Sequence, residues 1–232
     1  MTVGLEEEPD VRLGFREDGR VRQVNVLLVE DNDFTRSTVA SALSAEGCVV
    51  TAAVTTAREA VVAAAQNSID CAVIDLHLGI GPTGIDVAHA LRRNDPELGI
   101  VILTSYVDPR LLGGNQRPLP ADAVYLVKDD VHSTAQLREG IDEACALGGT
   151  TTAVPGRVPL TDSQVEVLRL VAHGMTNAEI ARRRVVTERS VEMTISRIIR
   201  RLGVIVGSGD NTRALLIQAY FAMIGSGQRR SP

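Results

Sequence analysis

Long apolar stretches, cysteine and lysine are scarce in this sequence, and the first two scarcities exclude whole classes of protein. No apolar run approaches the length of a membrane span, and the first ten residues lack the character of a signal peptide. The three cysteines, Cys48, Cys71 and Cys145, lie in apolar surroundings without the spacing of metal ligands. We therefore expect buried, reduced thiols in a cytoplasmic protein with no membrane segment.

Lysine is almost absent, which draws attention to the one that remains. Of the 24 basic residues only Lys128 is a lysine, and all others are arginine. A compact ammonium group on a flexible stem is not interchangeable with a planar guanidinium. Lys128 is therefore a candidate functional residue, with a neutral surface lysine as the alternative interpretation.

Length and charge indicate two domains. The chain has 232 residues, of which 44% are hydrophobic, so it can form two cores. We predict a disordered leader (1–23), a first domain (24–147), a linker rich in Gly, Thr and Pro (148–158), a second domain (159–225) and a tail (226–232). Residues 1–154 are acidic, with 12 basic and 23 acidic groups, whereas residues 155–232 hold 12 basic and 6 acidic groups. A basic second half suggests contact with nucleic acid.

The first domain alternates between apolar strands and helical patterns. Apolar runs at 24–29, at 49–54, ahead of Asp75, at 99–103 and at 123–127 predict strands. Helical patterns are expected at 33–46, 55–66, 85–93 and 133–146. This alternation predicts an α/β fold with a doubly wound, five-stranded parallel sheet.

Polar side chains stand at the ends of four of these strands. Glu30 and Asp31 follow the first, Asp75 follows the third, and the last two strands end at Thr104 and Lys128. In a parallel sheet these ends lie at one edge, where α/β proteins place their chemistry. Carboxylates suit Mg²⁺, and an aspartate can accept a phosphoryl group. An aspartate that only caps the next turn is the alternative for Asp75.

The motifs VLLVEDN, VIDLHLG, ILTSY and YLVKDD occur in this order from about Asn25 to Ala146. This part of the chain resembles the receiver domain of bacterial two-component response regulators. The resemblance implies that a sensor histidine kinase phosphorylates Asp75. It also implies that Mg²⁺ is held by Glu30, Asp31, Asp75 and the backbone carbonyl of His77, that Thr104 and Tyr125 form a switch pair, and that Lys128 pairs with the phosphate.

Two segments depart from the pattern of that family. The loop LHLGIGPTG after Asp75 is longer than the usual form, and its three glycines make it flexible. Residues 105–121 hold three prolines and a Gly pair, so the fourth helix of the domain should be short or irregular.

The second domain has the pattern of four helices. The first runs from Thr161 or Asp162 to Val171, a short one follows Thr176, a longer one ends near Leu202, and the last covers 213–224. A short helix, a turn and a longer helix form a helix-turn-helix, whose second helix enters the major groove of DNA. The alternative is a helical bundle with solvated charges.

The stretch from Leu160 to Val204 resembles the LuxR-type helix-turn-helix along its whole length. Glu192 stands where that family usually has a DNA-contacting lysine, so base preference should differ, since glutamate can accept from the cytosine amino group. The residues expected at the DNA are Thr176, Asn177, Glu188, Arg189, Glu192, Met193, Ser196, Arg197, Arg200 and Arg201.

Together these patterns resemble a NarL/LuxR-type response regulator. We expect phosphorylation of Asp75 to control sequence-specific binding to promoter half-sites, with a homodimer as the active form, Mg²⁺ as cofactor and no enzymatic turnover. One alternative is a DNA-binding regulator whose receiver responds to a ligand or partner protein without phosphorylation. Another is a phosphorelay or protein-interaction module that binds no DNA.

Overall fold

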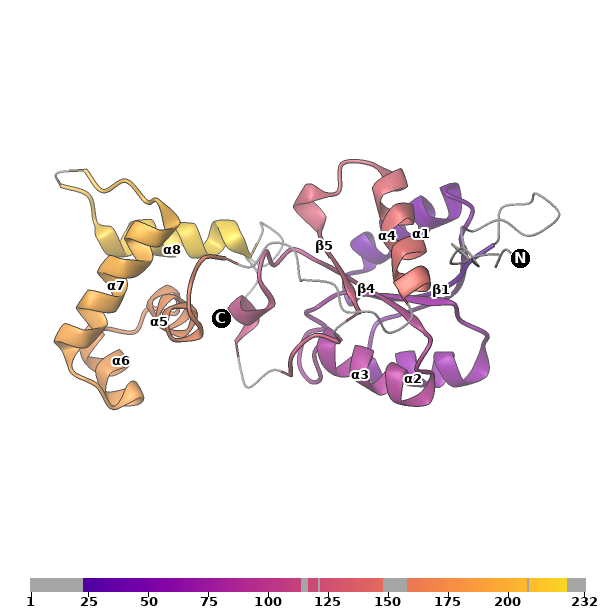
Figure 1. Cartoon of the computed structure of the whole chain (residues 1–232), viewed down its shortest axis with the longest axis horizontal. Helices are drawn as coiled ribbons and strands as arrows, with labels where there is room; N and C mark the ends of the chain where they lie inside the picture. The colour runs from indigo at the N-terminus through magenta and orange to yellow at the C-terminus, as the bar shows by residue number, and fades with distance from the viewer. Residues whose placement is uncertain (1–22, 114–116, 121, 148–157, 208, 225–232) are drawn as a thin grey trace, which may run out of the picture.

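The computed structural model describes residues 23–113, 117–120, 122–147, 158–207 and 209–224. Nearly all of the predicted leader and linker, and the whole predicted tail, therefore lie outside the described residues. Figure 1 shows an α/β body built around a sheet and, beside it, a body made of helices. The predicted fold class is confirmed.

The α/β body alternates strands and helices in chain order. Its elements are β1 (Asn25–Val29), α1 (Asp33–Ala45), β2 (Val49–Val54), α2 (Ala57–Gln66), β3 (Cys71–Ile74), α3 (Gly84–Asn94), β4 (Gly99–Thr104), the 3₁₀ turn η1 (Pro109–Leu112), β5 (Val124–Val127), the 3₁₀ turn η2 (Lys128–Asp130) and α4 (Thr134–Leu147). The predicted helices agree with these bounds within one or two residues. Side-chain caps set several starts: Thr56 and Thr83 each form a capping box ahead of α2 and α3.

All neighbouring strands of the sheet are parallel, in the order β2-β1-β3-β4-β5. Alternate side chains of the strands enter two separate cores. One face packs against α2 and α3, and the other packs against α1 and α4 (Figure 1). The central strands β3 and β4 are buried along their whole length, as their continuous apolar sequence predicts.

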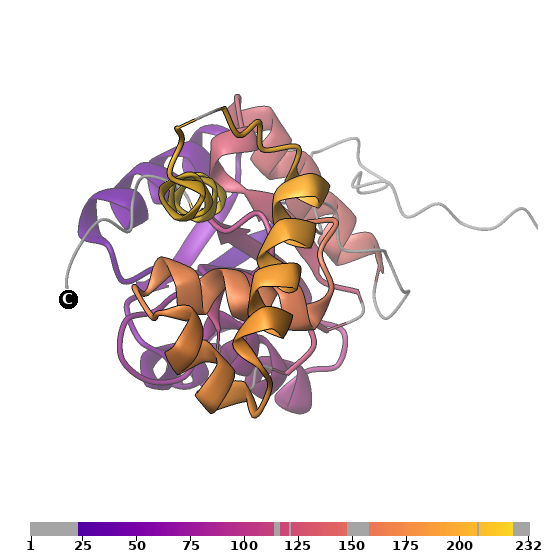
Figure 2. The same cartoon turned by 90° about the vertical axis from the view of Figure 1, so that its left-hand side faces the viewer.

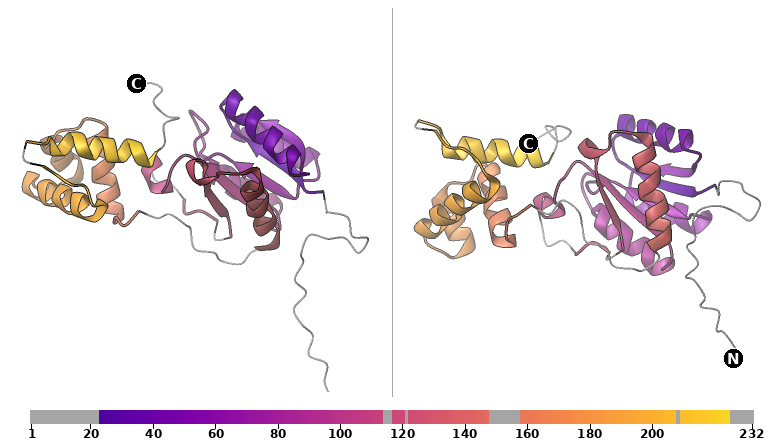
Figure 3. Two further views of the ribbon diagram at one scale, coloured as in Figure 1. Left: turned by 90° about the horizontal axis from the view of Figure 1, so that it is seen from above. Right: turned by 45° about the horizontal axis from the view of Figure 1, so that its top comes forward.

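The chain between β4 and β5 contains no α-helix among its described residues. The turn η1 covers only Pro109–Leu112, with Asp108 capping it from the side chain. Prolines and glycines in this stretch account for the missing helix, as predicted. Figure 3 shows η1, in magenta, standing out from the sheet toward the helical body.

The helical body contains α5 (Asp162–Ala172), α6 (Asn177–Arg184), α7 (Glu188–Leu202) and α8 (Thr212–Met223). Threonine caps begin the first three of these helices, and Gly203 in the left-handed region ends α7. The core is formed by apolar residues at helical spacing, among them Val165, Leu168, Ile180, Val191 and Ile198. Their spacing of three, four or seven residues within each helix places them on one face.

The three cysteines are free thiols. Cys48 and Cys71 are buried, while Cys145 is only half-buried, so the expectation of three fully buried thiols holds for two of them. Within the described residues, none of the helices has the length and apolar character needed to cross a membrane.

Candidate functional site

The acidic residues at the ends of β1 and β3 meet in one place. The two strands are direct neighbours in the sheet, and Val29 lies beside Ile74, so the residues that follow are brought together. Carboxylate oxygens of Glu30, Asp31 and Asp75 all lie within 4.8 Å of one another. Glu30 is buried and Asp31 is exposed, so one side of this acidic group is covered by the protein and the other is accessible to solvent.

Lys128 reaches this group from the end of β5. Its Nζ lies 2.6 Å from Oε2 of Glu30 and 3.3 Å from Oδ2 of Asp75. The side chain of Lys128 is 21% exposed. Lys128 is therefore held between two carboxylates, and the alternative of a neutral surface lysine does not describe its position.

Burial and charge shift the protonation of this group. Burial raises the pKa of Asp75, and the ammonium of Lys128 only partly offsets the effect. Burial and the neighbouring charge of Asp75 likewise raise the pKa of Glu30. Burial works against the charged form of Lys128, but the carboxylates of Asp75 and Glu30 outweigh it and raise the pKa of Lys128. The site is therefore negative and partly desolvated, which favours a cation.

Thr104 and Tyr125 are joined to each other through hydrogen bonds to Tyr106. The Thr104 hydroxyl and the His77 backbone N–H both favour the charged form of the Asp75 carboxylate, and so work against the rise in its pKa that burial causes. Thr104 Oγ1 also accepts from the Tyr106 N–H at 3.3 Å. The Tyr125 hydroxyl donates to the Tyr106 carbonyl at 2.6 Å, and the ring is buried. The predicted switch pair thus meets at Tyr106, a residue that the sequence analysis did not single out.

A glycine brings α3 against the backbone of Asp75. Gly84 is the first residue of α3, and its N–H donates to the Leu76 carbonyl at 2.9 Å. A Cβ atom at Gly84 would lie 2.1 Å from the carbonyl oxygen of Asp75. Gly79, at φ +71, turns the preceding loop beside Oδ2 of Asp31. The long loop is therefore packed onto the site.

The donor set fits Mg²⁺. Three carboxylates supply hard oxygen atoms, and Mg²⁺ binds through few protein carboxylates while it keeps several waters. The exposed side of the group, at Asp31, leaves room for such waters. The carboxylates that could hold the ion are three of the ligands predicted from the sequence, Glu30, Asp31 and Asp75, and the backbone carbonyl of His77 stays a prediction.

A second candidate site is the exposed face of α7. Val191 and Ile198 on the inner face are buried, which turns the polar residues of this amphipathic helix outward. In Figure 2 this helix, in orange, crosses the face that is turned toward the viewer. Its exposed residues from the predicted set are Glu188, Arg189, Glu192, Met193, Ser196, Arg197, Arg200 and Arg201.

Three residues of the predicted DNA set are engaged inside the domain. The side chain of Thr176 caps α6 in a capping box with Glu179. Asn177 Oδ1 accepts from Nη1 of Arg213 at 3.4 Å. Arg201 Nη1 donates to Oε1 of Gln164 at 3.2 Å. Their first role is therefore to position helices.

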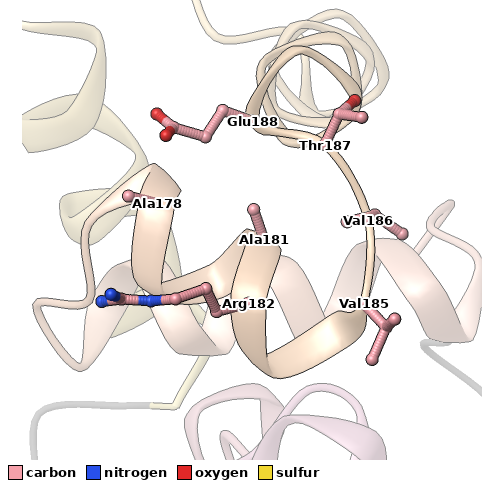
Figure 4. Close-up of a pocket in the computed structure, with 7 residues that line it drawn as sticks. All are labelled: Ala178, Ala181, Arg182, Val185, Val186, Thr187 and Glu188. Carbon is pink, nitrogen blue, oxygen red and sulfur yellow. The ribbon is translucent and has the colours of Figure 1, made fainter.

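An open groove of about 680 Å³ separates α6 from the start of α7. Figure 4 shows Arg182 and Glu188 extending from the two helices toward the same side of this groove. Arg182 and Arg183 are exposed cations that the sequence analysis did not include among the residues at the DNA. The three consecutive arginines that end α6 are a sequence signal that could have indicated them. Val185 in the turn is 91% exposed and has φ +54, a conformation that β-branched residues rarely adopt.

Two sequence families match separate parts of the chain. The family described as "Response regulator receiver domain" matches residues 26–114. The family described as "Bacterial regulatory proteins, luxR family" matches residues 158–205. The first match covers the acid group around Asp75, and the second covers α5, α6 and α7.

Characterised proteins resemble the chain over most of its length. The DNA-binding transcriptional activator DevR/DosR of Mycobacterium tuberculosis is 29% identical over 78% of this chain and 88% of its own. The response regulator protein VraR of Staphylococcus aureus is 24% identical over 83% of this chain and 95% of its own. A solved structure of two RcsB dimers bound to two parallel DNAs shares the fold, with a TM-score of 0.53 and 19% identity over 88% of this chain and all of that chain.

Proposed function

The chain is a two-component response regulator of the NarL/LuxR type, with a receiver domain followed by a LuxR-type helix-turn-helix domain that controls transcription, and from this premise we propose that Asp75 is its phosphoacceptor. The observation that carries the proposal is the group at the sheet edge, where Lys128 reaches both Glu30 and Asp75. A sensor histidine kinase would supply the phosphoryl group.

The residues of the site divide the chemistry between them. A carboxylate oxygen of Asp75 attacks phosphorus, and the bond between phosphorus and the kinase histidine breaks. Mg²⁺ held by Glu30 and Asp31 would neutralise charge on the transferred oxygens. Lys128 turns from Asp75 to the phosphoryl oxygens, and the hydroxyl of Thr104 turns with it. Beyond this self-modification we propose no enzymatic turnover.

The test of the phosphoacceptor is the intact mass of the protein after incubation with acetyl phosphate and Mg²⁺. We expect a single phosphoryl adduct in the wild type and none in Asp75→Asn. Asp33→Asn is the matched control, because Asp33 is an aspartate on α1 whose side chain is 89% exposed. The proposal fails if the wild type gains no adduct, or if Asp75→Asn gains one as readily as Asp33→Asn.

We also propose that α7 reads promoter half-sites in the major groove, with a homodimer as the active form. The name of the Mycobacterium relative, a DNA-binding transcriptional activator, supports this role. Exposed Arg189, Arg197 and Arg200 suit phosphate, and Glu192 suits the cytosine amino group. The exposed cation Arg182 extends the basic surface across the groove to α6.

DNA binding is tested by titration of a labelled promoter fragment at several salt concentrations. Removing one phosphate contact by Arg197→Ala should weaken binding and reduce the slope of log K against log salt by about 1. Arg93→Ala is the matched control, an exposed arginine at the end of α3 in the receiver. Equal slopes for both variants would contradict the assignment, and absence of binding in the wild type would favour a protein-interaction module.

Control without phosphate is the second candidate function. The observation that favours it is the irregular chain between β4 and β5, where only the short η1 is formed among the described residues. The same mass measurement separates the two candidates, because a receiver controlled only by a ligand or partner needs no adduct on Asp75. DNA binding that is unchanged by a stoichiometric adduct would favour this second candidate.

A further inference from the structure

The three cysteines of the chain gather in one core of the receiver, at the end of the sheet opposite to Asp75. Cys71 is the first residue of β3, Cys48 directly precedes β2, and Cys145 lies near the end of α4. Cys48 and Cys71 are buried in the core on the α1 and α4 side of the sheet, and Cys145 packs against that core. The fold therefore brings together thiols from three separate stretches of sequence.

A glycine lets the end of α4 lie close to Cys71. Gly99 of β4 is the partner of Cys71 in the sheet. A Cβ atom at Gly99 would lie only 3.2 Å from the backbone nitrogen of Cys145. The thiol of Cys145 donates to the carbonyl of Asp70, the residue before Cys71, at 3.7 Å. The sulfur of Cys145 thus lies beside the backbone that leads directly into Cys71.

The three thiols differ in their access to solvent. Cys71 is fully buried, and the neighbouring thiol of Cys145, followed by burial, raises the pKa of Cys71 well above its usual value. Burial also raises the pKa of Cys48, and the charge of Arg138 offsets this only in part. Cys145 is half-buried. Because oxidants react with accessible thiolates, Cys145 is the cysteine that a dissolved oxidant reaches first.

The arrangement of the thiols favours a reaction between two of them over a shared metal ion. Among the described residues, which include all three cysteines, the group of metal-ligating side chains with atoms within 4.8 Å of one another is the acidic one around Asp75. The sulfur of Cys48 lies 3.8 Å from Nη1 of Arg138 on α4. Cys48 therefore has its own partner, whereas Cys71 and Cys145 are neighbours.

We propose that Cys145 and Cys71 form a reversible disulfide when the protein meets a peroxide. The thiolate of Cys145, its proton lost to solvent, attacks one oxygen of hydrogen peroxide, so the O–O bond breaks, hydroxide leaves and Cys145 becomes a sulfenic acid. The sulfur of Cys71 then attacks the sulfur of the sulfenic acid. An S–S bond forms, the S–O bond breaks, and the hydroxyl group leaves as water with the proton of Cys71.

This disulfide would give the receiver a second site of covalent modification. Asp75 follows the carboxyl end of β3, and Cys71 begins the same strand, so the two sites lie at its opposite ends. The disulfide would tie β3 to α4 and close a long loop of the chain, which lowers the freedom of the unfolded state. The proposal goes beyond the phosphorylation proposed above and does not depend on it.

Counting free thiols in the full-length protein tests the proposal. The protein is treated with hydrogen peroxide, unfolded and alkylated with iodoacetamide, and its intact mass is measured. We expect the number of alkylated cysteines to fall from three to one, and dithiothreitol to restore all three. Arg58 and Arg92 place each cysteine in a different tryptic peptide, so the linked peptides identify the pair.

Single substitutions separate the roles of the three cysteines. Cys145→Ser should abolish the disulfide, whereas Cys48→Ser, the matched control, should form it as readily as the wild type. In Cys71→Ala the sulfenic acid on Cys145 has no partner, so dimedone should trap it. Far-UV circular dichroism checks the fold, and Cys145→Ser decides the pair should Cys71→Ala fail to fold. Oxidation should raise the thermal unfolding midpoint of the wild type by at least ~5 °C.

Several results would overturn the proposal. One is three alkylated cysteines in a wild-type protein whose methionines the same treatment has oxidised, because the peroxide would then have acted without forming the bond. Another is a linked peptide that contains Cys48, or a bond between two copies of the chain on a non-reducing gel. A disulfide that persists in Cys145→Ser would likewise contradict the assigned pair.

Discussion

Substituting Gly84 by alanine is the sharpest test of how the phosphoacceptor is positioned. Gly84 opens α3, and its missing side chain lets the helix lie against the strand end that carries Asp75. A Cβ atom would lie 2.1 Å from the carbonyl oxygen of Asp75 and 2.9 Å from its carbonyl carbon. Both are backbone atoms, so the clash can be relieved only if α3 or the end of β3 moves.

The expected loss of stability follows from two opposing contributions. Alanine is favoured over glycine inside helices by about 1 kcal/mol, and this gain is smaller at a first helical residue. Forcing a methyl group into a filled site typically costs about 1–3 kcal/mol. We therefore expect Gly84→Ala to lower the free energy of unfolding by about 1–2 kcal/mol and to slow adduct formation at Asp75, whose backbone must shift.

Gly140→Ala is the matched control. Gly140 lies inside α4 of the same domain, and a Cβ atom there would meet Cδ1 of Leu126 at 2.8 Å. This atom is the end of a flexible side chain and can turn away, so the helix gain of up to about 1 kcal/mol should remain. Urea unfolding followed by far-UV circular dichroism measures both variants, and intact mass measures the adduct. Our account of the site is refuted if Gly84→Ala is as stable as Gly140→Ala and forms the adduct at the wild-type rate.

Four further changes test other parts of the structure. Val185→Gly should raise the free energy of unfolding by up to about 1 kcal/mol. A non-glycine residue in the left-handed region costs roughly 1–2 kcal/mol, and the greater chain entropy of glycine in the unfolded state offsets part of the gain. A lower free energy of unfolding in urea would contradict this prediction. Lys128→Arg should slow adduct formation at least ~10-fold, about 1.4 kcal/mol, because a planar guanidinium cannot replace an ammonium between two carboxylates; a wild-type rate by mass time course would count against it. Glu192→Lys should tighten DNA binding and steepen its salt slope by about 1, and an unchanged slope in fluorescence anisotropy would place Glu192 away from phosphate. Hydrogen bonds from Thr176 lower the pKa of Glu179, so the stabilisation of α6 by Glu179 is present above the unfolded pKa and lost as the pH falls through the lower folded pKa. Glu179→Gln should therefore weaken the dependence of the thermal unfolding midpoint on acid pH. A pH profile equal to that of the wild type would contradict this role of Glu179.

The sheet and its polar edge could be predicted from the sequence because their signals are local. Each apolar strand and the polar residue after it are neighbours in the chain, and parallel strands place such residues at one edge. The sequence alone therefore predicts that Glu30 and Asp75 lie in one site. Their distances to Lys128 had no such local signal, because Nζ reaches Glu30 across 98 positions of sequence.

The helix-turn-helix was predictable for the same reason. Threonine caps, the apolar stripe of α7 and Gly203 after it are all read within a few residues of each other. The roles of Thr176, Asn177 and Arg201 were not, because exposure alone does not tell whether a polar side chain faces DNA or a neighbouring helix. Arg201 lies on the long polar helix and yet bonds to Gln164 on α5.

The sequence by itself determined the order of elements, the two-domain plan and the list of acidic residues at the sheet edge, since periodicity and strand-end chemistry are properties of short stretches. Tertiary structure alone decided where the irregular chain after β4 goes. Prolines in that stretch exclude a regular helix, but they do not indicate that Arg110 binds Asp162 on α5 or that Leu111 contacts Tyr220. Those partners lie some 50 to 109 positions away, and a contact over such a distance depends on how two finished domains fit together.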